Sequence, residues 1–281
     1  MRIAIASGKG GTGKTTVSVN LALSLENVQL LDCDVEEPNC NLFLGHPLQK
    51  VEDVGIQVPA ISKDKCTSCG KCAEACRFNA LAVLLTGVIL FPKLCHGCGA
   101  CSIACTKGAI SETIQVIGSI ERSASHTHGI ELYQGVLNIG EPMASPIIRT
   151  LKGHIDNSRT VIIDSPPGTS CPVISSITGA DYCILVTEPT PFGLHDLMLA
   201  VDLVKDLQLP HGVIINRYGT GNDGVEDYCS ENSIPVLMKI PYDIRIAQLY
   251  SEGTPFVLRM PHWKDRFQDT FRQLQELTGR F

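Results

Sequence analysis

The chain has 281 residues, of which 44% are hydrophobic and 19% are charged, and its formal net charge is −6. This is the composition of a globular protein, which excludes a disordered or low-complexity chain. The basic excess typical of nucleic-acid-binding proteins is missing, and so is the run of about 18 apolar residues that a membrane span needs. The amino-terminal apolar stretch is too short for a signal peptide. We therefore expect a cytoplasmic protein that binds no nucleic acid.

Residues 2–6 form a short apolar run, which predicts a strand that ends at a glycine-rich loop. Residues 14–25 follow with helical spacing of apolar side chains, and residues 28–31 form a second apolar run. Strand, loop, helix and strand in this order are typical of the start of a parallel α/β sheet.

The same pattern resumes in the second half of the chain. Short runs rich in β-branched residues predict buried strands, and longer segments between them have helical periodicity. The predicted strands are residues 161–163, 182–186 and 212–215, and the predicted helices are residues 195–207 and 263–277. We therefore predict a doubly wound, mostly parallel α/β sheet.

The glycine-rich loop has the sequence GKGGTGKTT at residues 8–16, which matches the Walker A pattern from Gly8 to Thr15. Small residues let successive backbone N–H groups point at phosphate oxygens, and the dipole of the following helix attracts the same group. Lys14 is expected to reach the β- and γ-phosphates, and Thr15 to bind Mg²⁺ through its hydroxyl. The other phosphate-binding candidates are Gly10, Gly11, Thr12, Gly13 and Thr16.

Three further segments carry motifs that point to one class of proteins. Lys9 stands near the start of the loop in KGGTGKT, residues 30–38 read LLDCDVEEP, and residues 161–169 read VIIDSPPGT. Together they resemble the MinD/ParA/Mrp class of P-loop ATPases with a deviant Walker A motif, which includes the nitrogenase iron protein. The resemblance implies ATP hydrolysis by a homodimer that encloses ATP, with Lys9 contacting the nucleotide of the partner. A second cation there would stabilise the charge of the transferring phosphoryl group.

The same resemblance implies roles for residues that follow the predicted strands. Asp34 is expected to orient the attacking water, Asp32 to belong to the magnesium shell, and Asp164 to bind Mg²⁺ through water. Carboxylates near a cation and a water suit this chemistry, although Asp32 and Asp34 could exchange roles. The residues implied to hold adenine are Asn216, Arg217, Pro241 and Asp243.

Cysteines interrupt the α/β pattern in the middle of the chain. The segments CTSCGKCAEACRFNAL (66–81) and CHGCGACSIACTKGAI (95–110) form an internal repeat with the spacing C-x2-C-x2-C-x3-C. This spacing is that of bacterial two-cluster ferredoxins. We therefore predict two [4Fe-4S] clusters in a small α+β ferredoxin-like domain, inserted at residues 60–112. Residues 1–59 and 113–281 would then form the P-loop ATPase domain.

In such a run the fourth cysteine ligates the other cluster. One cluster is thus expected to take Cys66, Cys69, Cys72 and Cys105, and the other to take Cys95, Cys98, Cys101 and Cys76. Four-cysteine zinc sites are the competing interpretation.

Three weaker sequence features concern a cysteine, a pair of histidines and the last predicted helix. Cys171 follows Asp164 at much the distance found for a cluster-ligating cysteine in the nitrogenase iron protein, which implies a place at the dimer face. His126 and His128 form an HxH string, for which we favour a solvated loop over a metal site. The helix at 263–277 carries acidic residues on its polar face, so we expect it to pack against the sheet and not on a membrane.

The motifs favour an ATPase whose nucleotide-switched dimer couples ATP to electron transfer, or to metallocluster assembly, on an unidentified protein partner. One alternative is a spatial-organising ATPase like MinD or ParA with redox-sensing clusters. Another is a carrier or scaffold for iron–sulfur clusters. A ferredoxin without ATPase activity is disfavoured, because several nucleotide-binding motifs occur in order along the chain.

Overall fold

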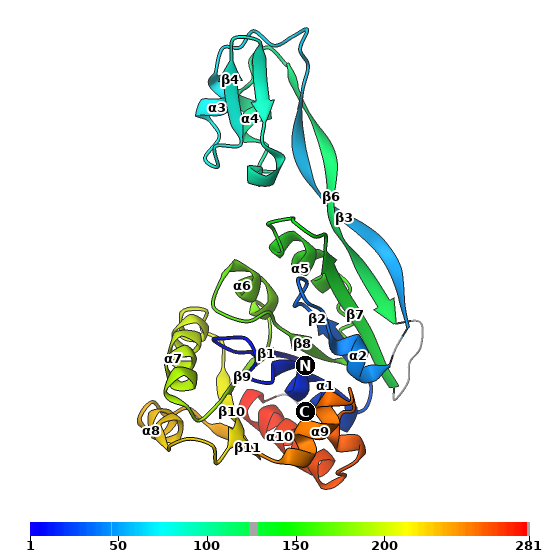
Figure 1. The fold of residues 1–281 in the computed structure, drawn as a ribbon, viewed down its shortest axis with the longest axis vertical. Helices are drawn as coiled ribbons and strands as arrows, with labels where there is room; N and C mark the ends of the chain where they lie inside the picture. The colour runs from blue at the N-terminus through cyan, green and yellow to red at the C-terminus, as the bar shows by residue number, and fades with distance from the viewer. Residues whose placement is uncertain (46, 124–128, 280–281) are drawn as a thin grey trace.

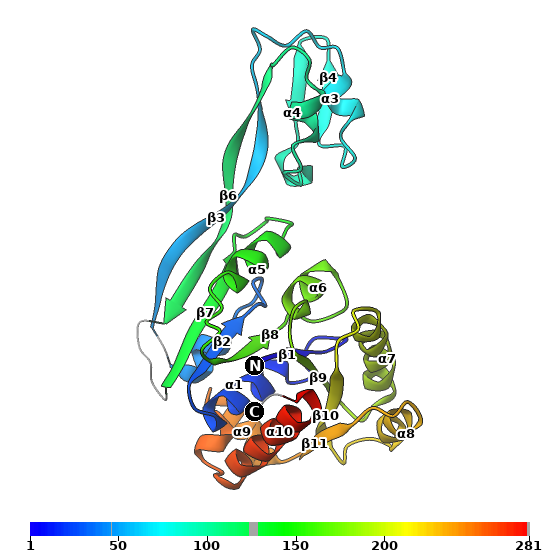
Figure 2. The ribbon, with the colours of Figure 1, turned by 180° about the vertical axis from the view of Figure 1, so that it is seen from behind.

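The computed structural model describes residues 1–45, 47–123 and 129–279. The predicted architecture is confirmed: within these residues, nine strands form one sheet with helices on both faces (Figures 1 and 2). His126 and His128 lie outside the described residues.

Parallel strands build most of the sheet. They are β1 (Arg2–Ala6), β2 (Val28–Asp32), β7 (Ile130–Leu137), β8 (Thr160–Asp164), β9 (Tyr182–Thr187), β10 (His211–Tyr218) and β11 (Val236–Pro241). Their spatial order is β11-β10-β9-β1-β8-β2-β7. On one side of β1 the chain adds β9, β10 and β11 in succession, and on the other side β8 returns to lie between β1 and β2. The strands predicted from apolar runs correspond to β1, β2, β8, β9 and β10.

Two helical layers cover this sheet. One layer contains α1 (Lys14–Ser24), α2 (Cys40–Leu44), α9 (Ile244–Ser251), the 3-10 helix η3 (Phe256–Leu258) and α10 (His262–Thr278), and the other contains α5 (Ser145–Lys152), α6 (Cys171–Ile177), α7 (Pro191–Asp206) and α8 (Gly224–Glu231). Alternation along β1 feeds both cores, since Ile3 and Ile5 pack under the first layer and Ala4 and Ala6 under the second.

The carboxy-terminal helix α10 packs against the sheet, as predicted from the sequence. Trp263, Phe267 and Leu274 are at most 2% exposed and belong to the same core as α1. Among the described residues, none of the helices has the length and apolarity needed to cross a membrane.

A long hairpin extends from the edge of the sheet. β6 (Ile110–Ser123) pairs antiparallel with β7 only from Gly118 to Arg122, whereas β3 (Leu48–Ile61) follows β6 over its whole length. The distal parts, residues 55–61 and 110–116, therefore leave the sheet as a two-stranded stalk (Figure 1). Sequence analysis did not predict these strands.

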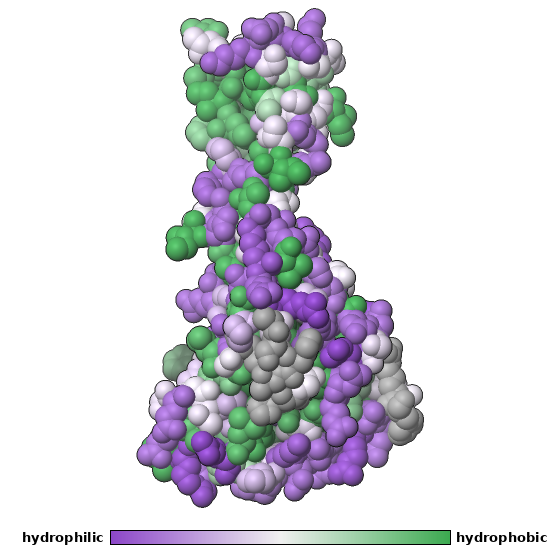
Figure 3. Space-filling view, turned by 90° about the vertical axis from the view of Figure 1, so that its right-hand side faces the viewer, coloured by the Kyte–Doolittle hydropathy of each residue, from purple (hydrophilic) through white to green (hydrophobic). Residues whose placement is uncertain are grey.

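Residues 62–109, here called the cysteine module, lie at the far end of the stalk. The module contains α3 (Lys71–Glu74), β4 (Leu81–Leu84), β5 (Gly87–Leu90), the 3-10 helix η1 (Pro92–Leu94) and α4 (Ala100–Ala104). A narrow waist separates it from the rest of the molecule, which we call the main domain (Figure 3). The Nζ of Lys93 nevertheless lies 2.6 Å from Oε1 of Glu141, in the loop between β7 and α5 of the main domain.

Candidate functional site

The glycine-rich loop joins β1 to α1 and is held by the neighbouring strand. Gly13 has φ 100° and caps α1, and a Cβ at this position would lie 2.3 Å from the Asn216 side-chain nitrogen. Asn216 in turn donates a hydrogen bond of 2.8 Å to the carbonyl of Thr12. At the other end of the loop, a Cβ on Gly8 would lie 2.0 Å from the carbonyl oxygen of Asp196. Glycine is therefore required at both ends for the loop to fold against β10 and α7.

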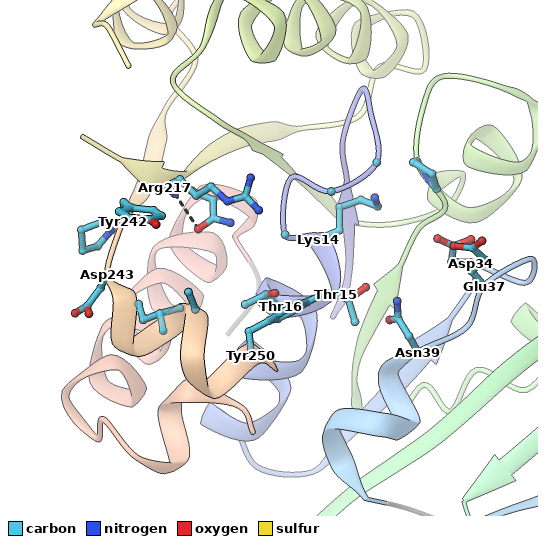
Figure 4. A pocket seen from close by; sticks show the side chains of 18 residues that line it. Lys14, Thr15, Thr16, Asp34, Glu37, Asn39, Arg217, Tyr242, Asp243 and Tyr250 are labelled. Carbon is cyan, nitrogen blue, oxygen red and sulfur yellow. Dashed lines mark hydrogen bonds between the residues drawn. The ribbon is translucent and has the colours of Figure 1, made fainter. Parts of the chain in front are cut away.

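A cavity of about 390 Å³ opens beside this loop. Figure 4 shows that it is elongated, with Lys14 and Thr15 near its middle, Asp34 at one end and Tyr242 at the other. Its lining residues are Gly10, Gly11, Gly13, Lys14, Thr15, Thr16, Asp34, Glu37, Asn39, Pro167, Asn216, Arg217, Pro241, Tyr242, Asp243, Ile246, Ala247 and Tyr250. A cavity with backbone donors in the centre and aromatic side chains at one end has the shape and chemistry to hold a nucleotide.

Carboxylates lie under the Asp34 end of the cavity. Asp164, at the end of β8, accepts hydrogen bonds from Thr15 Oγ1 at 2.7 Å and from Ser18 Oγ at 2.8 Å. Asp32, at the end of β2, accepts three backbone N–H groups, those of Asp34, Asn39 and Cys40. Parallel strands bring these carboxyl ends together at one edge of the sheet, as expected for a ligand site in an open α/β fold.

Burial dominates the electrostatics of this edge. Burial, together with the charge of Asp164, raises the pKa of Asp32 to about 7, and burial also raises the pKa of Asp164. Burial lowers the pKa of Lys14, which the nearby carboxylates partly offset. Oxygens of Asp32 and Asp164 lie within 4.8 Å of each other and of the Cys40 sulfur. Two buried carboxylates at this separation suit a divalent cation, which would neutralise both.

Lys9 is not one of the residues that line the cavity. Its Nζ lies 3.9 Å from Oε2 of Glu188, and Nη1 of Arg217 lies 2.5 Å from Oε1 of the same residue. Glu188 is nearly buried, at the end of β9. Sequence analysis missed Glu188, and only its position directly after a predicted strand would have drawn attention to it.

The Tyr242 end of the cavity contains the four residues assigned to adenine. Arg217 has φ 52° and follows Asn216 at the end of β10. Asp243 lines the cavity, but its carboxylate caps α9 and pairs with Arg245 at 2.7 Å, so it is already engaged. Residues that sequence analysis missed complete the wall, namely Tyr242, Ile246, Ala247 and Tyr250. Helical periodicity would have placed the last three on one face of α9.

The eight clustered cysteines gather in two cavities of the cysteine module, and each cavity combines the two repeats. The distal quartet, Cys66, Cys69, Cys72 and Cys105, shares its cavity with Ile61 and Ile110 at the far end of the stalk. The proximal quartet, Cys95, Cys98, Cys101 and Cys76, shares its cavity with Gln57, Pro59 and Glu112, nearer the main domain. The fourth cysteine of each repeat therefore lies with the first three of the other repeat.

The thiols have a shared local geometry. The sulfur of Cys76 accepts the N–H of Ala80 at 3.3 Å, and the sulfur of Cys105 accepts the N–H of Ala109 at the same distance. Tetrahedral zinc, with Zn–S bonds of about 2.3 Å, would hold four sulfurs about 3.8 Å apart. Within the described residues, no three cysteine sulfurs lie within 4.8 Å of one another. The quartets thus suit a larger group better than a single zinc ion.

The other cysteines divide into buried and exposed groups. Cys33, Cys40, Cys183 and Cys229 are buried, which is the usual place of a free cysteine. Cys171 is exposed at the start of α6, the helix that follows the loop after β8.

The chain has a parallel sheet, a phosphate-binding loop at the start of α1, and aspartates at the ends of β2 and β8. These features define a P-loop nucleotide-binding protein. More specifically, residues 3–256 match the CobQ/CobB/MinD/ParA nucleotide binding domain, and the chain belongs to this family. The chain is therefore an ATP-binding protein of the MinD/ParA ATPase family.

Similar proteins span nearly the whole chain. An uncharacterized protein of Methanocaldococcus jannaschii is 35% identical over 264 residues, covering 92% of this chain and 91% of its own. An iron-sulfur cluster carrier protein of the same organism is 26% identical, covering 98% of this chain and 84% of its own. The septum site-determining protein MinD of Pyrococcus horikoshii, solved with Mg-ADP, has a TM-score of 0.57 at 25% identity, covering 99% of this chain and 97% of that one.

Proposed function

We propose that the chain is an iron–sulfur ATPase, in which an ATP-dependent homodimer couples Mg²⁺-dependent hydrolysis to electron transfer, or to metallocluster assembly, on a partner protein. The observation that carries this proposal is the joining of two crossed cysteine quartets to a P-loop domain through one stalk. The ferredoxin-like domain of residues 60–112 would carry the clusters, and residues 1–59 and 113–281 would bind ATP.

The residues of the main domain have distinct tasks in this proposal. Lys14 and the loop N–H groups bind the phosphates, and Thr15 with Asp32 and Asp164 holds Mg²⁺. Asp34, at the opening of the cavity, orients the attacking water. Lys9 leaves Glu188 and stabilises the phosphoryl group bound to the other protomer. Asn216 and Arg217, with Pro241 and Asp243, surround the base.

The residues of the cysteine module bind and tune the clusters. Each quartet supplies four thiolates, and the N–H groups of Ala80 and Ala109 hydrogen-bond to cysteine sulfur. Such hydrogen bonds stabilise the negative charge of a thiolate and raise a cluster potential. A bound [4Fe-4S] cluster supplies one-electron transfer at low potential.

A combined experiment tests the proposal. After anaerobic reconstitution, we expect about eight irons per chain, Mg²⁺-dependent ATPase activity, and a rate of cluster reduction that changes when ATP is added. Lys14→Ala, which cannot bind the phosphates properly, should abolish the ATP effect and retain the iron. Cluster potentials and reduction rates that do not change when nucleotide is added would contradict the coupling.

A cluster carrier is the second candidate, favoured by the iron-sulfur cluster carrier protein among the relatives. The two functions differ in what leaves the protein. A carrier transfers iron and sulfide to an acceptor apoprotein, whereas an electron-transfer protein retains both through repeated reduction and reoxidation. Iron content measured after incubation with an apoferredoxin and gel filtration separates the two.

A further inference from the structure

The cysteine module differs in charge from the rest of the chain. Residues 62–109 contain six lysine or arginine residues and two acidic residues, so the formal charge of this segment is +4. Because the whole chain carries −6, the remaining residues carry −10. A local excess of positive charge on an acidic protein steers the approach of negatively charged partners.

Most of this positive charge surrounds one quartet. Lys63, Lys65, Lys71 and Lys107 are exposed, and each lies within three residues of a cysteine of the distal quartet. Lys71 and Lys107 line its cavity directly. We call these four side chains the lysine face. Asp64 and Glu74 reduce the charge of the segment, and a bound cluster with its four thiolates would add negative charge at the centre, so the positive charge lies on the exposed lysine side chains around it.

The proximal quartet has a different environment. Glu112 lines its cavity, the exposed Arg77 follows Cys76, and Lys93 is paired with Glu141 of the main domain. The distal quartet lies against Ile61 and Ile110, two to four residues farther along the stalk than Pro59 and Gln57. At about 3.4 Å per residue, it is about 7–14 Å farther from the main domain.

Each quartet has one exposed cysteine, Cys69 in the distal quartet and Cys98 in the proximal one, but the distal quartet lies farther from the main domain. It lies at the free end of the molecule, where hydrophilic residues form the tip above a largely hydrophobic surface (Figure 3). Cys69, one of its four cysteines, is exposed. A protein that docks at the lysine face would therefore meet a thiolate ligand of the cluster without any contact to the main domain.

We propose that the lysine face is the docking surface for an acidic redox protein, which exchanges one electron with the cluster of the distal quartet. The inference rests on the proposed function, because it requires that cluster. The four cations of the face are lysines, which bind as compact point charges, and they surround a redox site, whereas the exposed Arg77 follows Cys76 of the other quartet. These features favour an acidic protein over a nucleic acid.

A strongly acidic flavodoxin is a suitable probe. Its hydroquinone loses one electron and becomes the semiquinone, while the cluster of the distal quartet gains that electron and no bond is formed or broken. The test variant combines Lys65→Gln, Lys71→Gln and Lys107→Gln. The matched control combines Lys50→Gln, Lys205→Gln and Lys264→Gln, which removes the same charge from exposed positions of the main domain and the base of the hairpin.

Stopped-flow reduction at low ionic strength then measures docking. The rate constant should fall about tenfold in the test variant and less than about twofold in the control, and the difference should vanish near 0.5 M salt. Reduction by the methyl viologen radical cation should not slow in either variant, because a cation gains nothing from the lysine face. A second variant, Lys63→Gln with Lys65→Gln, should show a smaller loss of the same kind.

The opposite results separate two failures. A wild-type chain that binds no iron overturns the proposed function together with docking. Equal flavodoxin rates in the test and control variants, each loaded with iron, overturn docking alone. So does an equal slowing with methyl viologen, which would place the defect in the cluster. A DNA duplex that binds the wild type but not the test variant would also contradict the assignment to an acidic protein.

Discussion

The Nζ of Lys9 lies 3.9 Å from Oε2 of Glu188 in the same chain. A lysine that acts on the nucleotide of a partner must leave this carboxylate, since one ammonium group cannot occupy both places. Glu188 also binds Arg217 at the base end of the cavity. Glu188 therefore connects the two cationic residues that flank the nucleotide, and its charge opposes the release of Lys9.

We predict that Lys9→Ala lowers the ATPase turnover number by about 10³-fold, the scale of a removed arginine finger. ATP affinity should change little, because the phosphates of the bound nucleotide contact Lys14 of the same chain. Glu188→Gln should instead favour the ATP-dependent dimer, which light scattering measures. Equal loss of affinity and turnover in Lys9→Ala would show that this lysine acts on its own nucleotide.

A second prediction concerns Ser18, whose buried hydroxyl donates to Asp164 at 2.8 Å. Ser18→Ala leaves one buried carboxylate oxygen with no hydroxyl donor, which should cost about 1–2 kcal/mol of the free energy of unfolding. Urea denaturation of the nucleotide-free protein measures this loss. Ser251→Ala, which removes an exposed hydroxyl bonded to a backbone carbonyl, is the control and should have little effect.

The stability of the nucleotide-free protein should depend on pH through Asp34. Burial raises the pKa of this carboxyl group to about 6, and Lys14 opposes the shift. A folded-state pKa above the ordinary value of about 4 stabilises the fold at low pH, and this contribution is lost as pH rises through 6. The melting temperature of Asp34→Asn minus that of the wild type should therefore increase as the pH rises from 4 to about 7. A constant difference between the two would contradict the shift.

The crossed quartets predict which cluster each cysteine variant loses. Cys76→Ala removes a ligand of the proximal quartet although this residue belongs to the first repeat, and Cys105→Ala removes a ligand of the distal quartet. We expect the iron content to fall by about half in either variant. Each variant should then show one of the two electron paramagnetic resonance signals of the reduced wild type, and the two variants should show different ones. Identical residual spectra would contradict the crossed arrangement.

The contact between Lys93 and Glu141 links the cysteine module to the main domain. Lys93→Ala should change the free energy of unfolding by less than about 1 kcal/mol, because the lysine is largely exposed. It should nevertheless speed amide exchange in residues 93–95 and weaken the effect of ATP on cluster reduction. Lys50→Ala, which breaks the exposed pair with Asp53, should do neither.

Local patterns in the sequence predicted the sheet, which the structure confirms, and named the candidate residues of both sites, whose roles stay predictions. The apolar runs correspond to buried strands, and the glycine and cysteine motifs specify chemistry within a few residues. The stalk was missed for a physical reason. Val54, Ile56 and Val58 alternate with other residues in β3, but the pairing of β3 with β6 joins residues far apart in the chain, and no local pattern indicates such a pairing.

Long-range contacts of single side chains could not be predicted from local sequence patterns either. Nothing local to Glu188 indicates that it binds Lys9 and Arg217 together, and nothing local to Lys93 indicates Glu141. The wall formed by Tyr242 and α9 depends on how the last parallel strand ends. Such contacts follow from the assembled fold, whereas a motif reports only the residues it contains.

The pairing of Ile61 with Ile110 has a consequence for how the chain folds. The cysteine module has only a small apolar core, around Val58, Ala80 and Cys95. Without metal, pairing of the two stalk strands closes a long flexible loop, residues 62–109. The loss of chain entropy on closing this loop opposes the first contacts of the stalk. With metal bound, the two ends of the loop are already held together. Assembly of the stalk should therefore follow cofactor loading, while the parallel sheet folds independently of it.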